Sequence, residues 1–514
     1  MTDTKRPTRF ARNAVANGIA FLFTVAVAFF LSPYMVEHLG ATRYGVWSLI
    51  ASLVGYLGLL DLGIRQAVNR YIAGYYATGA HRESSLIVSA ALRLFGFLGI
   101  LAILSSGVLA YFAPILFNIP EALANDARTV IVLGGLAIAV SFVGGVFGGV
   151  VSGLERFEFG CCLEILVLSV RTVAIVLALR EGYGLVALAG IQLSASVLQC
   201  IVFWAALHKL YAELRIRLWG VLGPQMRTIL SFSASLTVLY ALSKIISYSD
   251  TVVIGAFLPI EFVTFFVIAG SLSMYAKEMP ASLSILMTPR VSAMTSIGSN
   301  RVGELILGVA RIATLASAPI ALTLVFRGES FIGLWMGPAY APLSGEVLRI
   351  LAAVAWLDAS RSVVIYSLTG MAKQRTVIPG IAIEAACNLA LSLALVQRFG
   401  IVGVALGTLI PNVLINLGYI PRCLSKATGV PVRFFCRNAV LLPTIASLPF
   451  GLATAAIERF LPASNLAVFF LQTTLILPLV PVTGWFLCLS SAEKEQVKSV
   501  VRKRIERQVP GPML

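Results

Sequence analysis

The sequence predicts an all-α polytopic membrane protein with fourteen transmembrane helices. Of its 514 residues, 58% are hydrophobic and only 12% are charged, which excludes an ordinary soluble domain. Apolar stretches of about 20 residues or more recur along the whole chain, and each is long enough to cross roughly 30 Å of hydrocarbon. The basic residues are also divided unequally between alternate loops.

The predicted membrane spans follow one another with short loops between them. The first stretch is too long for the apolar core of a signal peptide and is followed by no A-x-A-like site, so we interpret it as a span. In chain order the predicted spans are Ala11–Val36, Tyr44–Leu62, Leu86–Phe112, Thr129–Ser152, Phe159–Leu179, Gly184–Leu207, Thr228–Phe257, Phe262–Thr288, Val302–Phe326, Val347–Leu368, Thr376–Val396, Gly400–Ile420, Phe435–Ile457 and Leu466–Leu489.

The loops predict the orientation. Because the number of spans is even, both termini lie on one side, and the basic N-terminus (Lys5, Arg6, Arg9, Arg12) places that side in the cytoplasm. On this assignment 26 of the 39 Lys and Arg lie in cytoplasmic segments, 6 in outer segments and 7 within spans. The net charge of +16 therefore reflects topology, and no nucleic-acid partner is expected.

The loops and the rarer residues argue against an enzyme. No loop exceeds roughly 25 residues, well short of a soluble catalytic domain. The seven cysteines and three histidines show no metal-ligand spacing, so neither a metal nor another cofactor is expected.

An internal repeat predicts two lobes. At a shift of 218, Leu179–Gly182 lies over Gln397–Gly400, and at a shift of 219, Trp47–Leu49 lies over Phe266–Ile268. The repeat unit is six spans, an even number, so the two copies run in the same sense. The predicted parts are an N-lobe (1–208), a cytoplasmic linker (209–227), a C-lobe (228–420), a helix pair (421–489) and a basic cytoplasmic tail (490–514).

Charged residues inside the spans are the most informative feature. An ionised side chain in hydrocarbon costs several kcal/mol unless it faces protein or water. A wet internal cavity is therefore expected, and its basic excess favours an anionic cargo. The bases are Arg93, Arg171, Lys244, Lys277, Arg311, Arg349 and Arg361, and the acids are Asp61, Glu164, Asp250, Glu278, Asp358 and Glu384.

The seventh span carries a polar stripe that includes Tyr240, Lys244, Ser247 and Asp250 on one face. A stripe of this length needs water or polar partners. We interpret it as cavity lining with Lys244 as the foremost cargo contact. The alternative is a helix packed against polar neighbours.

The other charges admit structural interpretations too. Asp358 and Arg361 lie one turn apart and can neutralise each other, or cargo or a proton can compete for one partner. Lys277 and Glu278 are adjacent, so one of them is expected to meet a partner on another helix. The predicted substrate-binding residues are Lys244, Lys277, Arg361, Arg171, Arg93, Arg311, Tyr240 and Ser247, and the predicted ion-coupling candidates are Asp250, Glu278 and Asp358.

Short motifs near the N-terminus carry a family resemblance. Leu39-Gly40, Tyr44-Gly45-Val46-Trp47, Leu60-Asp61-Leu62-Gly63 and Arg70 resemble the opening of lipid-linked oligosaccharide flippases of the polysaccharide or O-antigen type. These belong to the superfamily that also contains multidrug exporters and the peptidoglycan-precursor flippase. The resemblance implies translocation of polyprenyl-diphosphate-linked oligosaccharide across a bacterial inner membrane by alternating access through a basic central cavity. Its implied partners are this lipid, membrane lipid and other polysaccharide-assembly membrane proteins, with coupling to H⁺ or Na⁺ left open.

Two alternatives stay open. A cation-coupled multidrug exporter has the same fold, and the margin of bases over acids within the spans is small. A membrane-embedded glycosyltransferase or polymerase is disfavoured by the short outer loops. In the tail, Lys494, Lys498 and Arg502 alternate with apolar residues, which predicts a basic helix on the inner leaflet or a solvated tail.

Overall fold

The computed structural model describes residues 6–217, 223–299, 301–489, 494–495 and 499. Every regular element in these residues is helical, which confirms the predicted all-α class. The predicted basic tail, 490–514, lies outside the described residues except at 494–495 and 499. The helices divide into two compact units, one formed by residues 1–267 with 385–404 and the other by 268–384 with 405–514.

Ten helical stretches among the described residues are long and apolar enough to cross a membrane. Two of them, Gly18–Ala77 and Gln374–Thr428, have 60 and 55 residues, far more than the roughly 20 that one crossing needs. Gly40 (φ 72°) and Gly400 (φ 57°) interrupt the helical backbone inside these stretches, in a region that favours glycine. A multi-pass membrane protein is therefore confirmed, whereas the count of fourteen is not established by these ten stretches.

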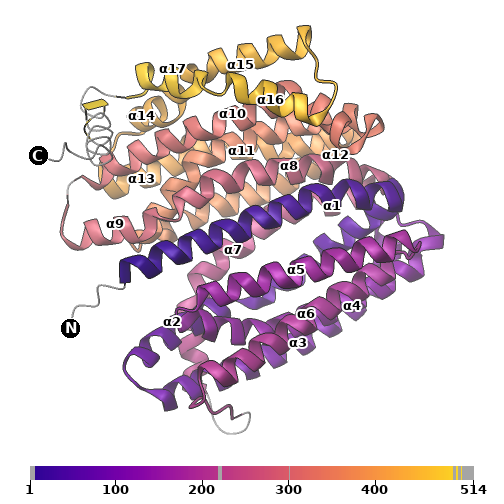
Figure 1. The fold of residues 1–514 in the computed structure, drawn as a ribbon, viewed down its shortest axis with the longest axis vertical. Helices are drawn as coiled ribbons and strands as arrows, with labels where there is room; N and C mark the ends of the chain where they lie inside the picture. The colour runs from indigo at the N-terminus through magenta and orange to yellow at the C-terminus, as the bar shows by residue number, and fades with distance from the viewer. Residues whose placement is uncertain (1–5, 218–222, 300, 490–493, 496–498, 500–514) are drawn as a thin grey trace, which may run out of the picture. The chain divides into compact units, whose positions relative to one another are not determined.

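Unit 1 is a bundle of helices in which α4 contacts both α3 and α6 (Figure 1). The rings of Phe95 and Phe142 stack at 5.0 Å between α3 and α4 in its core. Its elements are α1 (Arg6–Leu57), η1 (Gly58–Asp61), α2 (Ile64–Ala77), α3 (His81–Leu116), α4 (Glu121–Gly153), α5 (Phe157–Arg180), α6 (Leu185–Leu210), α7 (Gly223–Phe257), the start of α8 (Glu261–Ser284) and the middle of α12 (Ile378–Leu414).

Small residues let α4 approach its neighbours closely. A Cβ atom added to Gly153 would lie 2.9 Å from the carbonyl oxygen of Asn69 on α2, and one added to Gly144 would lie 3.3 Å from Cys200 on α6. The absence of side chains at these positions therefore permits the close packing of α4 against α2 and α6.

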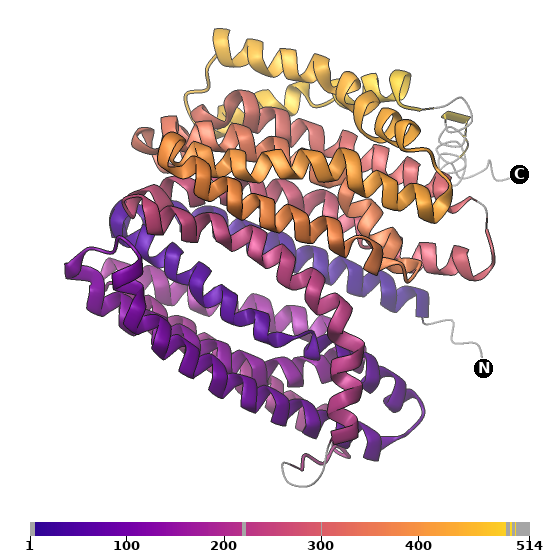
Figure 2. The same cartoon turned by 180° about the vertical axis from the view of Figure 1, so that it is seen from behind.

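Unit 2 is built around α10, which packs against α11 on one side and α15 on another (Figure 2). Besides the remaining parts of α8 and α12, its elements are α9 (Met287–Ser296), α10 (Val302–Met336), η2 (Pro338–Tyr340), α11 (Ala341–Gly370), η3 (Gln374–Thr376), the π-helical η4 (Ile415–Tyr419), α13 (Ile420–Thr428), α14 (Val432–Phe435), η5 (Cys436–Leu441), α15 (Leu442–Phe460), α16 (Leu466–Ile476) and α17 (Leu479–Leu487).

One buried arginine of α10 forms hydrogen bonds to the C-terminal helices α15 and α16. Arg327 has no exposed side-chain surface, donates from Nε to Glu458 of α15 at 2.9 Å and from Nη2 to Gln472 of α16 at 2.6 Å. Its guanidinium also lies 4.3 Å from the ring centroid of Phe469. Arg327 directly follows the predicted span Val302–Phe326, and it is buried because α10 continues to Met336.

Candidate functional site

Lys244 lies between two tyrosines on its own helix, α7. Tyr240 precedes it by one turn and Tyr248 follows by one turn, with ring centroids 5.4 and 5.1 Å from the lysine Nζ. Nζ also lies 3.2 Å from the Tyr248 hydroxyl. The distances to the two ring centroids are within the range of a cation–π contact. The lysine charge is therefore held by neutral groups, which do not cancel it. Tyr240 is 54% exposed, and Ser247 is also exposed.

Asp250, six residues after Lys244 on α7, is 5% exposed and contacts α12 within unit 1. Its Oδ1 atom lies 3.3 Å from the Nδ2 of Asn388 and 3.5 Å from the hydroxyl of Ser392. Ser249 donates to the Asn388 Oδ1 at 3.0 Å, which turns the amide NH₂ of Asn388 toward Asp250. Ser392 also reaches the carbonyl oxygen of Val404 at 3.4 Å.

The Asp250 surroundings are rich in oxygen atoms from a carboxylate, an amide, hydroxyls and a backbone carbonyl. Such a set suits a proton or a hard monovalent cation better than a transition metal. Among the described residues, no group of three or more His, Cys, Asp or Glu side chains has the arrangement to hold a metal ion.

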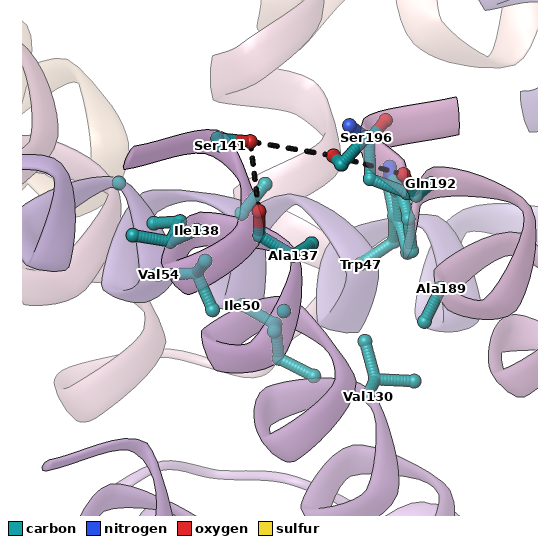
Figure 3. A pocket seen from close by; sticks show the side chains of 13 residues that line it. Trp47, Ile50, Val54, Val130, Ala137, Ile138, Ser141, Ala189, Gln192 and Ser196 are labelled. Atoms are coloured by element: carbon teal, nitrogen blue, oxygen red, sulfur yellow. Dashed lines mark hydrogen bonds between the residues drawn. The ribbon is translucent and has the colours of Figure 1, made fainter. Parts of the chain in front are cut away.

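A cavity of about 260 Å³ lies inside unit 1 between α1, α4 and α6 (Figure 3). Trp47 of α1 forms part of its wall, and most of the remaining lining is aliphatic. The polar groups gather at one place, where the hydroxyls of Ser141 and Ser196 lie 3.4 Å apart near Gln192. This cavity was not predicted from the sequence, although Gln192 and Ser196 are one turn apart on the predicted span Gly184–Leu207.

Arg171 lies in a neighbouring cavity of about 220 Å³ that shares Gln192 and Ser196 with the first. Its Nη1 donates to the Gln192 Oε1 at 2.9 Å, while its buried Nε has no hydrogen-bond partner in the described structure. Glu164 lines the same cavity, but no ion pair joins it to Arg171 among the described residues. As with Lys244, the partner of this cation is a neutral group.

In unit 2, charged side chains of three helices pair with one another. Arg361 of α11 contacts Glu384 of α12 through two contacts of 2.7 and 2.8 Å, and lies 3.7 Å from Asp358. Lys277 of α8 lies 3.1 Å from the other oxygen of Asp358, which confirms that one member of the adjacent pair meets another helix. The second member, Glu278, is exposed. Two cations and two carboxylates therefore form a cluster whose formal charges cancel.

Two amides complete this cluster. Asn412 donates to Asp358 at 3.0 Å and to Glu384 at 3.2 Å, and Asn416 donates to Asp358 at 3.1 Å and to the Asn412 oxygen at 2.9 Å. Neither asparagine was predicted from the sequence as a site residue. Their spacing of four residues within a predicted span is the signal that could have identified them.

Two further predicted substrate-binding residues lie on other helices. Arg93 lies on α3 and is partly buried, and Arg311 lies on α10 and is 8% exposed. Arg349 forms an exposed ion pair with Glu329 at 2.7 Å, so its charge is satisfied outside the buried clusters.

A family described as "Polysaccharide biosynthesis protein" matches residues 10–293. A putative O-antigen transporter of Shigella flexneri is 21% identical over 411 residues, which cover 77% of this chain and 93% of that protein. The solved structure of a lipid II flippase, MurJ, in an inward closed conformation has a TM-score of 0.68 at 13% identity, covering 91% of this chain and 98% of that one.

A multidrug resistance MATE transporter in an inward-facing conformation gives a TM-score of 0.65 at 14% identity, covering 80% of this chain and 95% of that one. At these identities both structures establish the fold alone, and the similar scores do not separate a lipid cargo from a drug cargo. The family match spans more than half of the chain and includes all the N-terminal motifs that carried the resemblance. The chain therefore belongs to the polysaccharide biosynthesis protein family, a family of transmembrane flippase-type transporters and not of enzymes.

Proposed function

We propose that this protein is a flippase that moves polyprenyl-diphosphate-linked oligosaccharide across a bacterial inner membrane by alternating access. The family match supports this class, and the similarity to a putative O-antigen transporter of Shigella flexneri supports a glycan cargo. We further propose fourteen crossings with both termini in the cytoplasm. Fourteen crossings result if each of the two long helical stretches crosses twice and α8 and α11 also cross.

Lys244 and Arg171 carry the proposal, because each is a cation in a membrane helix that is held by neutral side chains. A diphosphate that leaves water needs charge-assisted hydrogen bonds to offset its lost hydration. A cation whose charge is not cancelled by a carboxylate can supply them. We assign Lys244 as the main diphosphate contact, with Tyr240 and Ser247 beside it, and Arg171 as a second contact.

Lys277 and Arg361 act differently in this scheme. Each is bound to a carboxylate, so a cargo diphosphate must displace Asp358 or Glu384 before it can bind. This exchange makes the cluster a switch that responds to cargo, and Asp358 is then the carboxylate released. Arg93 and Arg311 stay predicted cargo contacts, because each is a cation within a predicted membrane span.

Asp250 is the coupling site that we favour for H⁺ or Na⁺. It is buried, and its Oδ1 lies beside two neutral groups, the Nδ2 of Asn388 and the hydroxyl of Ser392. Asp358, by contrast, is engaged by two cations, and Glu278 is exposed.

Transport in vesicles tests the proposal. The purified protein is reconstituted into vesicles, and the movement of a fluorescent polyprenyl-diphosphate sugar is followed by quenching from outside, with a cationic dye assayed in parallel. We expect transport of the lipid-linked sugar and none of the dye. Transport of the dye without the lipid would contradict the flippase assignment and favour a drug exporter.

A further inference from the structure

A basic pocket of about 420 Å³ lies in unit 2, between the turn that joins α11 to α12 and the helix α13. It is larger than the two cavities described in unit 1. Its lining includes Lys373, Thr376, Tyr419, Arg422, Cys423 and Lys426. None of them belongs to the charged clusters described above.

Four of these side chains lie on one helical segment. Tyr419, Arg422, Cys423 and Lys426 follow one another at steps of three, one and three residues, so they lie along one face of the helical segment that continues from η4 into α13. The other buried residues of α13, Ile420, Pro421 and Leu424, hold the helix against the rest of unit 2.

Hydrogen bonds tie the turn to this helix. The Tyr419 hydroxyl donates to the carbonyl oxygen of Thr376 at 3.0 Å, and the Cys423 thiol lies 3.4 Å from the same oxygen. The Lys373 Nζ donates to the carbonyl oxygen of Ala427 at 3.3 Å. The two walls of the pocket therefore hold their positions relative to each other.

The charge of the pocket is unbalanced. Three cations, Lys373, Arg422 and Lys426, line it together with no carboxylate. In the part of the chain that the structure describes, none of the three takes part in an ion pair. Cations that share one small pocket repel each other. An anion bound between them would attract all three and offset this repulsion.

We propose that this pocket binds a phosphate-bearing headgroup. Phosphate oxygens accept hydrogen bonds only, and a guanidinium flanked by two ammonium groups offers the matching donors. The pocket lies at helix ends, since α11 ends at Gly370 and α12 begins at Ile378. By the predicted orientation this end faces the cytoplasmic leaflet, whose anionic lipids attract basic residues. This inference is independent of the cargo assigned above.

Lipid retention by the full chain in detergent tests the site. Phosphatidylglycerol, phosphatidylcholine and inorganic pyrophosphate are each titrated, and binding is followed by native mass spectrometry. The test variant is Lys373→Ala/Arg422→Ala/Lys426→Ala. The matched control is Arg375→Ala, which removes a cation from the same turn outside the pocket lining. A conservative single variant, Arg422→Gln, covers the case in which the triple variant does not fold.

We expect wild type and Arg375→Ala to bind phosphatidylglycerol more tightly than phosphatidylcholine. The triple variant should bind it about 100-fold more weakly, given the attraction that each basic residue contributes near an anionic surface, and Arg422→Gln several-fold more weakly. Binding of pyrophosphate that depends on the same residues would support the site and identify a soluble source of the phosphate. Equal binding by wild type and the pocket variants, or an equal loss in Arg375→Ala, would overturn the proposal.

Discussion

Lys277 and Arg361 of unit 2 contact the carboxylates of Asp358 and Glu384, whereas Lys244 and Arg171 of unit 1 contact tyrosine and glutamine side chains. Both arrangements offset part of the loss of hydration that a buried cation undergoes. They differ in the charge that is left. An ion pair presents almost no net charge to an approaching anion, while a cation held by neutral groups keeps its full charge.

This difference suggests a division of roles between the units. A buried ion pair resists the removal of either partner, because the remaining charge would be left without compensation. Replacing a basic residue that is held by neutral groups should lower the free energy of unfolding less, but it should weaken anion binding more. Stability and transport measurements on matched variants can therefore separate the two arrangements.

The largest effect is expected at Arg361, whose side chain is 12% exposed. Arg361→Met leaves Glu384 without its cation in a buried position, so the free energy of unfolding should fall by about 3–5 kcal/mol. Urea unfolding of the detergent-solubilised protein, followed by circular dichroism, measures this change. Adding Glu384→Gln to the variant should recover part of the loss. A fall below about 1 kcal/mol, a value usual for exposed pairs, would show that the cluster is not a structural ion pair.

Lys244→Ala should show the opposite pattern. Loss of a hydrogen bond from a charged group to the diphosphate costs about 1.5–3 kcal/mol, so transport of the lipid-linked sugar should fall about 10- to 100-fold. The free energy of unfolding should change by only about 1 kcal/mol, the size of a cation–π contact. The fluorescent-lipid assay in vesicles measures transport, and the same urea titration measures stability.

The matched control is Lys209→Ala, which removes an exposed lysine from the C-terminal end of α6. It should leave both quantities unchanged. If Lys244→Ala transports at the wild-type rate, Lys244 is not a cargo contact and the contrast between the units has no functional meaning.

The sequence predicted two contacts that lie within one helix. The i, i+3 spacing of Asp358 and Arg361 predicted a pair, and one is present at 3.7 Å. The polar face of α7 likewise placed Tyr240 beside Lys244. Such spacings follow from the 3.6-residue helical period, which needs no knowledge of the tertiary fold.

Contacts between helices could not be predicted in this way. Arg361 meets Glu384 across 23 residues of sequence, and Asn388 meets Asp250 across 138. Hydrophobic spans of similar composition carry no local signal of which helix packs against which, because lipid-facing and protein-facing residues are both apolar. For the same reason the cavity beside Trp47 and Gln192 was missed.

Asp250→Asn tests the proposed ion-coupling site in unit 1. Asparagine keeps the size of the side chain and can still bond Asn388 and Ser392, but it carries no charge. In the wild type, an imposed H⁺ or Na⁺ gradient should accelerate transport about tenfold, within the usual range of coupling between two sites. In Asp250→Asn this acceleration should be lost. Vesicles with and without each gradient provide the measurement.

Glu278→Gln is the matched control in unit 2, since it removes one carboxylate charge from an exposed position. Gradient stimulation should persist in this variant. Stimulation that survives in Asp250→Asn and disappears in Glu278→Gln would move the coupling site to unit 2 and invert the proposed division of roles.

The smallest effect is expected at Arg349, which forms an ion pair with Glu329 at 2.7 Å but is 47% exposed. The pair has the same chemistry as Arg361 and Glu384, so it isolates the contribution of burial. Arg349→Met should lower the free energy of unfolding by about 0.5 kcal/mol or less, because water already solvates both charges, and the loss should shrink further at high salt. A loss as large as that of Arg361→Met in the same urea titration would show that burial does not set the strength of these pairs. The contrast between the units would then have to rest on the identity of the partner groups alone.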